Sequence, residues 1–404
     1  MAHHRQTEEA ARSRARSARV EARLQPVLGT AADRRGGEDP EAPWAGGQRP
    51  AHRPHRPLED LHWREREEPG TVPGLSGWRR RLVRLRHLSR LRPRTICVRA
   101  RVAVQKAVYH LARQVFTQKQ RDRINARLAR ARRKLAAVLQ IVNGRFDAAA
   151  LRTELLRALP ERFDALMVHC SFDDLLPMYS EGVGQLLAVL RDLCGRERTL
   201  AMPAFTYQVP GGDLAAHFRA HPRFDARRQP SQMGLLSEVF RRTPGVLRSL
   251  HPTHSVCALG PLAADITAGH HLTESTFGAR SPFARMAGLD TVILGLGKPF
   301  YRVLTQIHAA EDLLGDRFPL PREFKEVDVT LIGATGEYPY RLRIDATEFD
   351  RRLDRLPRML APGDLAEWRF HGVPLFRTSA GRVTTAICEA GLRGKTLYAG
   401  PTLI

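Results

Sequence analysis

From residue 147 onward, short apolar segments with the character of buried strands alternate with amphipathic helical segments. The pattern predicts strands at 163–172, 198–205 and 291–297, and helices at 147–160, 183–195 and 233–245. Strands that alternate with helices predict an α/β domain, in which a layered sheet is flanked by helices. We place this domain at residues 143–404, because the texture of the chain changes near Asn143-Gly144.

The N-terminal third is unlike the rest in charge. Residues 1–140 hold 33 Lys/Arg and 13 Asp/Glu, so most of the net charge of +23 lies there. Residues 1–75 are rich in Arg, Ala, Gly, Pro and Glu and show almost no aliphatic periodicity. Such a composition predicts disorder, because the segment buries too little apolar surface to offset its ordering entropy.

Residues 76–142 combine a high basic charge with apolar residues at helical spacing, Val104, Val108, Leu111 and Val115. The pattern predicts a basic amphipathic helical arm. One interpretation is that this arm contacts an anionic membrane or nucleic acid. The alternative is a solvated arm with no such partner.

The cysteines and the apolar runs bear on the compartment. Five cysteines are scattered along the chain without a CxxC pair, which argues against a disulfide framework and favours a reducing compartment. The sequence shows neither a signal peptide nor an apolar run of about 18 residues. We therefore expect a cytoplasmic protein.

Polar residues follow the apolar segments, where ligands of α/β folds gather. Ser171 and Phe172 end the first predicted strand, and Thr206 follows the second. The segment "RSLHPTHSVCALGP" (248–261) adds Ser249, His251 and Ser255. His251 alternatively caps backbone groups of its own loop. A zinc site is another alternative, which we do not favour, and would use His251, His254, His271 and His308.

The segment "LTQIHAAEDLLG" (304–315) carries the best candidate for a catalytic base. If the segment is helical, His308 and Glu311 share one face of the helix. Neutral imidazole suits the removal of a proton from an amine near pH 7, and a carboxylate on its other nitrogen fixes the tautomer.

Six short motifs along the chain resemble, in their order, those of the aminoglycoside 3-N-acetyltransferase family over roughly residues 147–350. They are "VHCSF", "TLAMPAFT", "RSLHPTHS", "TAGHHLTESTFGARSP", "VILGLG" and "HAAE". The resemblance implies that family's own α/β layered fold, which is separate from the Gcn5-related acetyltransferases. It also implies that the protein transfers an acetyl group from acetyl-coenzyme A to an amine without a metal. The resemblance associates this reaction with antibiotic resistance.

The resemblance further implies roles for individual residues. His308 is the general base, and a carboxylate downstream, either Glu348 or Asp345, orients it. Glu311 and His271 would face a cationic amino-sugar acceptor. The pantetheine arm of the cosubstrate would contact residues at the strand ends and in the segment 248–261, called the histidine loop below. These residues are Ser171, Phe172, Thr206, Ser249, His251 and Ser255.

Two further functions stay open at this point. A protein of the same fold could acylate an amine in a biosynthetic or cell-surface pathway, and the N-terminal extension favours this reading slightly. The second of these functions is that of a non-catalytic domain, which its basic arm tethers to membrane or nucleic acid.

Overall fold

The computed structural model describes residue 127 and residues 134–404, with the exception of 210–211, 274 and 348–349. The predictions for residues 1–75, and for nearly all of the arm at 76–142, therefore lie outside the described residues. The end of that arm forms helix α5 (Ala136–Asn143).

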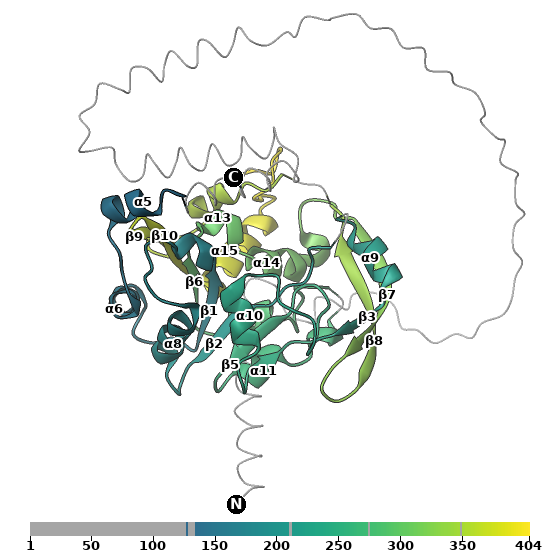
Figure 1. Ribbon diagram of the computed structural model, residues 1–404. Helices are drawn as coiled ribbons and strands as arrows, with labels where there is room; N and C mark the ends of the chain where they lie inside the picture. The colour runs from purple at the N-terminus through teal and green to yellow at the C-terminus, as the bar shows by residue number, and fades with distance from the viewer. Residues whose placement is uncertain (1–126, 128–133, 210–211, 274, 348–349) are drawn as a thin grey trace, which may run out of the picture. The chain divides into compact units, whose positions relative to one another are not determined.

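A seven-stranded sheet forms the centre of the described domain (Figure 1), with the strand order β4-β5-β2-β1-β6-β10-β9. Strands β1 (Ala165–Cys170), β2 (Thr199–Pro203) and β6 (Thr291–Leu296) run parallel to one another. The flanking strands are antiparallel to their neighbours: β4 (Leu247–Arg248), β5 (Val256–Leu259), β9 (Leu365–Phe370) and β10 (Val373–Ser379).

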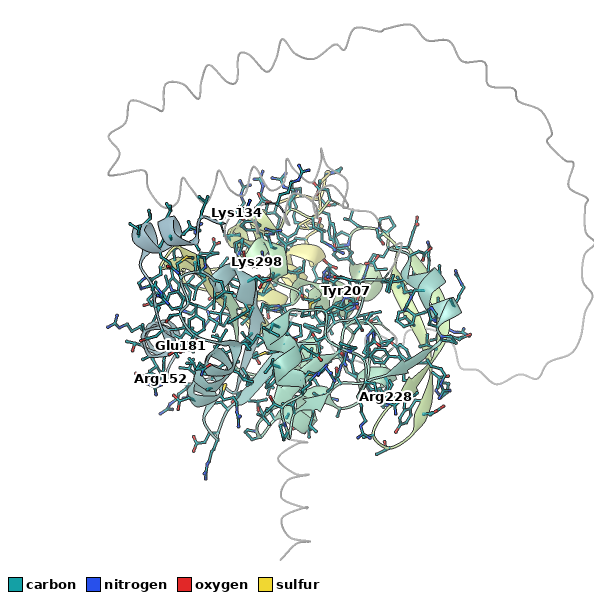
Figure 2. All side chains as sticks on the ribbon, in the orientation of Figure 1. Lys134, Arg152, Glu181, Tyr207, Arg228 and Lys298 are labelled. Carbon is teal, nitrogen blue, oxygen red and sulfur yellow. The ribbon has the colours of Figure 1, made fainter. Side chains whose placement is uncertain are left out.

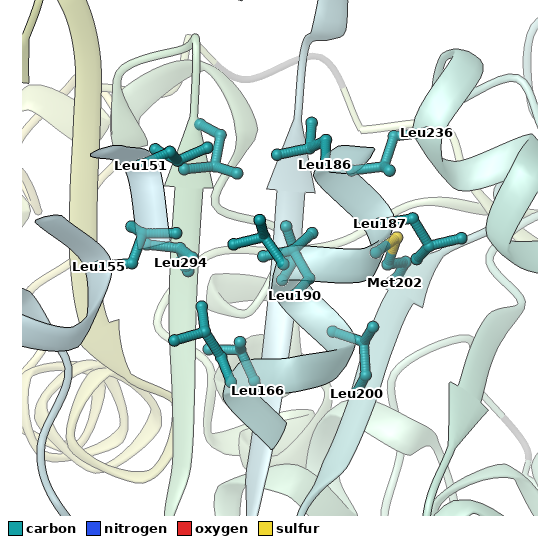
Figure 3. Close-up of a cluster of buried hydrophobic side chains, with 14 of the residues drawn as sticks. Leu151, Leu155, Leu166, Leu186, Leu187, Leu190, Leu200, Met202, Leu236 and Leu294 are labelled. Atoms are coloured by element: carbon teal, nitrogen blue, oxygen red, sulfur yellow. The ribbon is translucent and has the colours of Figure 1, made fainter. Parts of the chain in front are cut away.

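One face of the sheet is covered by α6 (Ala148–Ala158), α8 (Val183–Cys194) and α10 (Leu235–Arg241). Figure 3 shows how their leucines, such as Leu155 and Leu190, pack on Leu166, Leu200 and Leu294 of the parallel strands. These strands are buried on both faces, which is why they read as continuous apolar runs. The three strands and three helices predicted from the sequence are therefore confirmed, as is the α/β class.

The other face is covered by helices that follow β5, β6 and β10 in sequence. They are α11 (Ala263–Thr267), α12 (Pro282–Ala287), α14 (Ile307–Leu314) and α15 (Ala380–Leu392). Ser281 caps α12 by accepting a hydrogen bond from the amide of Ala284, and Pro282 supplies a first residue with a helical φ. Helix α15 packs on both α12 and α14, so it holds α14 against the sheet.

A second, three-stranded sheet lies apart from the first and has the order β3-β7-β8 (Figure 1). It consists of β3 (Arg223–Asp225), β7 (Phe324–Ile332) and β8 (Glu337–Asp345), and α9 (Leu214–Ala220) covers it. Its own apolar cluster includes Phe218, Val329 and Leu342. Short elements complete the domain: α7 (Phe172–Leu175), α13 (Phe300–Val303) and the 3-10 turns His270–Leu272, Gly315–Arg317 and Leu353–Arg358.

One close approach on the α15 side of the sheet requires a glycine. Gly295 of β6 pairs with Phe376 of β10, and a Cβ on Gly295 would lie 1.8 Å from Cε1 of that ring. The glycine thus leaves the space that the fully buried Phe376 ring occupies.

Candidate active site

Helix α14 brings His308 and Glu311 together on one face. Nδ1 of His308 lies 2.8 Å from Oε2 of Glu311. A carboxylate accepts hydrogen bonds and does not donate them, so Nδ1 carries the hydrogen and Nε2 is left as the basic nitrogen. The His308 side chain is 18% exposed and the Glu311 side chain is 4% exposed. The imidazole is therefore accessible to solvent, whereas the Glu311 carboxylate is buried.

The second oxygen of Glu311 is also occupied. The hydroxyl of Tyr398 donates to Oε1 at 2.7 Å, and Nε of Arg351 lies 3.0 Å from the same hydroxyl. Burial opposes ionisation of Glu311, but His308, Arg351 and Tyr398 outweigh it and lower its pKa to about 2. Glu311 is therefore a carboxylate near neutral pH, and its place beside Nδ1 would stabilise a positive charge on the imidazole.

Aromatic rings lie beside His308. Its ring centroid lies 5.1 Å from that of Phe277, which in turn lies 5.0 Å from His254. Tyr207, labelled in Figure 2, stacks on His254 at 5.3 Å with an angle of 17° between the planes. Burial lowers the pKa of His254 to about 3, with His308 and Arg351 acting in the same direction. His254 is therefore a neutral neighbour of His308.

The histidine loop is braced by its own polar side chains. Nδ1 of His251 accepts hydrogen bonds from the backbone amides of Thr253 and His254, at 3.2 and 3.1 Å. The His251 ring is fully buried and stacks on His270, and its Nε2 has no hydrogen-bond partner among the described residues.

The hydroxyls around this loop have internal partners as well. Ser249 Oγ accepts from the amide of Val256, Ser255 Oγ donates to the carbonyl of Ala204, and Thr206 Oγ1 donates to that of Pro252. These contacts tie the loop to the residues that follow β2. The family resemblance implies that Thr206, Ser249, His251 and Ser255 contact the thioester. In the structure their side chains form hydrogen bonds with residues of the loop and of the segment after β2.

Ser171 and Phe172 lie at the carboxyl end of β1. Ser171 Oγ donates to Oδ2 of Asp174 at 2.6 Å, and Lys298, which follows β6, forms an ion pair with the same carboxylate. Phe172 packs at the edge of the main apolar cluster, and its ring meets Tyr179 edge-on. This polar cluster is a separate group from the His308–Glu311 pair in all the contacts described here.

Asp345 and Glu348 are the two carboxylates that were expected to orient His308. Asp345 at the end of β8 accepts from Arg322 at 3.0 Å and from the amide of Thr347 at 2.9 Å. Glu348 lies outside the described residues. The carboxylate bonded to Nδ1 of His308 is that of Glu311. The sequence analysis had instead predicted that Glu311 faces the acceptor.

His271 lies in a 3-10 turn and its ring is 4.8 Å from that of Tyr338 on β8. Its Nδ1 is buried without a partner among the described residues. Within the same part of the chain, no group of three or more His, Cys, Asp or Glu side chains is placed to hold a metal ion. Nor is any helix there long and apolar enough to cross a membrane.

Sequence reasoning missed Tyr398 and Arg351. Neither residue belongs to a motif, and they reach Glu311 only because the chain returns to α14 after β8 and again after α15. An isolated tyrosine near the C-terminus carries no local signal of this role.

The described domain is a layered α/β domain that carries a histidine–glutamate pair beside aromatic rings. Comparison with known families then identifies it: residues 167–368 match the model of the family described as aminoglycoside 3-N-acetyltransferase. The chain belongs to this family, and the resemblance noted from its motifs is confirmed.

Known sequences and structures agree with this placement. The chain is 32% identical over 184 residues to aminoglycoside N(3)-acetyltransferase III of Pseudomonas aeruginosa, which covers 41% of this chain and 67% of the relative. It is 31% identical over 191 residues to aminoglycoside N(3)-acetyltransferase VII of Streptomyces paromomycinus, which covers 43% of this chain and 65% of the relative.

Among solved structures, AAC-IIIb in a binary complex with CoASH has 27% identity and a TM-score of 0.50, over 61% of this chain and 95% of that one. Aminoglycoside acetyltransferase AAC(3)-Xa has 24% identity and a TM-score of 0.53, over 65% and 96%, and shows the shared fold.

Proposed function

We propose that this protein transfers an acetyl group from acetyl-coenzyme A to an amino group of an aminoglycoside or a related amino sugar, with His308 as the general base. The observation that carries the proposal is the hydrogen bond from His308 Nδ1 to Glu311, which leaves Nε2 free to accept a proton. Membership of the family and the likeness to a structure with bound CoASH support the choice of donor.

The chemistry follows from this tautomer. Nε2 of His308 takes a proton from the acceptor nitrogen as that nitrogen bonds to the thioester carbon, and the carbonyl electrons move onto oxygen. The tetrahedral intermediate then collapses, the carbon–sulfur bond breaks, and the imidazolium returns the proton to the departing thiolate. Glu311 stabilises the imidazolium between these two steps.

The oxyanion of the tetrahedral intermediate needs hydrogen-bond donors, and the backbone amides near Ser171 and in the histidine loop are candidates for this role. The amide of Ser171 donates to the carbonyl of Leu296, and the amides of Thr253 and His254 donate to His251. These three amides therefore have partners already, and we propose that the histidine loop serves as a rigid wall for the thioester. In this proposal Ser249, His251 and Ser255 brace the loop and need not touch the cosubstrate.

A panel of amines tests which acceptor the enzyme uses. Both oxygens of Glu311 are occupied, so this residue is not a free carboxylate for an acceptor ammonium group. The full chain should be incubated with acetyl-coenzyme A and a panel of aminoglycosides, glucosamine and simple polyamines. Thiol release and the mass of the acetylated product are then measured.

The decisive variant is His308→Gln, which keeps a polar side chain without a base. We expect it to lower kcat by at least about 100-fold. His221→Gln, at an exposed position after α9, is the matched control and should behave as the unaltered protein. Failure to acetylate any amine of the panel, or full activity of His308→Gln, would overturn the proposal.

A further inference from the structure

The segment after α15 brings Tyr398 to the partner of the base. Main-chain hydrogen bonds join this segment to residues 350–352: the amide of Arg352 donates to Leu397 at 2.6 Å, and the amide of Ala399 donates to Asp350 at 2.9 Å. This short ladder places Tyr398 directly opposite Arg351. Tyr398 is buried, with 4% of its surface exposed, so its hydroxyl is held in place.

The direction of each hydrogen bond in the chain Arg351–Tyr398–Glu311–His308 is fixed by chemistry. A guanidinium group only donates, so the Tyr398 oxygen must accept from Nε of Arg351 and direct its single hydrogen at Glu311 Oε1. Burial, with Glu311 adding to it, raises the pKa of Tyr398, so the hydroxyl keeps that hydrogen. Glu311 thus receives one hydrogen bond on each oxygen.

We propose that Tyr398 and Arg351 are positioning residues that set the proton affinity of the base through Glu311. The proposal rests on the role of His308 as general base. A buried carboxylate bound to imidazole alone would hold the imidazolium tightly, and a base that is already protonated cannot act near neutral pH. The Tyr398 hydroxyl, with the Arg351 cation behind it, draws charge away from Glu311 and weakens that hold.

The other charged groups around the pair do not replace this effect. On α14 itself, Asp312 is matched by Arg322. From the histidine loop, His254 faces the pair as a neutral ring. From α15, the thiol of Cys388 contacts the carbonyl of Ala310 and burial raises its pKa to about 12, so it carries no charge. Arg351 is therefore the cation in contact with the Tyr398–Glu311 unit in the part of the chain described.

The test removes the hydroxyl and keeps the ring. In Tyr398→Phe, Glu311 loses one donor, so the imidazolium becomes more stable and the acid limb of the kcat/KM profile should move to higher pH by about half a unit to one unit. We expect kcat near neutral pH to fall severalfold, whereas KM for acetyl-coenzyme A should stay within about twofold.

Arg351→Met and Arg351→Lys form a second pair of variants. Loss of the cation in Arg351→Met should move the acid limb in the same direction, and Arg351→Lys should restore it in part because the charge is kept. Tyr179→Phe is the matched control, since Tyr179 is also buried and its hydroxyl donates to a glutamate, Glu181. It should leave the profile unmoved.

A measurement that needs no turnover separates this inference from the proposed function. Carbon-13 labelling of the histidine rings gives a titration curve for His308, assigned by its loss in His308→Gln. An upward shift in Tyr398→Phe supports the inference even if no acceptor is turned over. If the enzyme is active but neither the titration nor the acid limb moves in Tyr398→Phe or Arg351→Met, the inference is wrong.

Discussion

The rings of His251 and His270 stack with their centroids 4.5 Å apart, and neither ring is accessible to solvent. Burial lowers the pKa of His270 to about 4 and lowers that of His251 well below its usual value, and the neighbouring histidines act in the same direction. Burial likewise lowers the pKa of His169 in β1 to about 4. The core of the domain therefore contains several imidazoles that must stay neutral.

These histidines make the fold sensitive to acid. Unfolded histidines bind protons near pH 6.5, whereas the buried ones resist protonation until about pH 4, so stability is full above about pH 6.5 and falls as the pH drops toward 4. Each contributes a slope of up to about 1.4 kcal/mol per pH unit in that range. Urea unfolding at several pH values measures the slope.

Two variants test the assignment of that slope. His169→Gln should make the stability less dependent on pH by about one proton, because one buried imidazole is gone. His217→Gln on α9 removes a less buried imidazole and should leave the dependence unchanged. A urea midpoint that is constant from neutral pH to pH 5 would contradict the prediction.

His251→Ala separates bracing of the loop from contact with the cosubstrate. Because two backbone amides lose their acceptor and the buried ring leaves a cavity, we expect unfolding to become easier by about 2–4 kcal/mol. At a temperature where the variant is folded, KM for acetyl-coenzyme A should change little. A large rise in KM with unchanged stability would instead assign the imidazole to the thioester.

Gly295→Ala tests the close approach between β6 and β10. The added Cβ would overlap the Phe376 ring, so we expect a loss of about 2–3 kcal/mol or more in the free energy of unfolding. Phe376→Leu should relieve part of that loss when the two changes are combined. Gly184→Ala is the control, because a Cβ there meets nothing and α8 gains a better helix former. Equal stability of the two alanine variants would contradict the prediction.

Glu238→Gln tests a charge cluster on α10. Glu238 accepts from Arg241, Arg242 and the amide of Ser231, and the hydrogen bonds from Arg241 lead the effects that lower its pKa to about 2. A lowered pKa stabilises the fold above about pH 4.5 and the gain is lost as the pH falls toward 2. We expect Glu238→Gln to cost about 1–2 kcal/mol near pH 7 and almost nothing at pH 2.

The matched control for Glu238→Gln is Asp192→Asn, which removes one member of an exposed ion pair with Arg152. An exposed pair contributes little, so this change should cost less than about 0.5 kcal/mol. If both variants lose equal stability, or if the cost of Glu238→Gln persists at pH 2, the account of this cluster is wrong.

The sequence predicts the parallel core of the sheet well because both its faces are buried. β1, β2 and β6 read as continuous apolar runs, and the helices between them have an apolar face. The short strand β4 and the separate sheet of β3 with β7 were not predicted, because the first has two residues and the second depends on pairing between distant segments. Local periodicity does not contain that information.

The candidate site was likewise predicted only in part from the sequence. The His308–Glu311 pair lies within one helical turn, so its spacing was visible, although the role given to Glu311 was that of an acceptor contact. The thioester contacts expected of Ser249 and Ser255 came from family resemblance. In the structure the Ser249 hydroxyl accepts from the amide of Val256, and the Ser255 hydroxyl donates to the carbonyl of Ala204. Arg351 and Tyr398 join the site through long-range pairing, which no motif encodes.

Tyr398 comes from a stretch of chain beyond the region matched by the family model, which ends at residue 368. If Tyr398 and Arg351 act as proposed, an exchange at either position would change the proton affinity of His308 while the six motifs of the sequence stay intact.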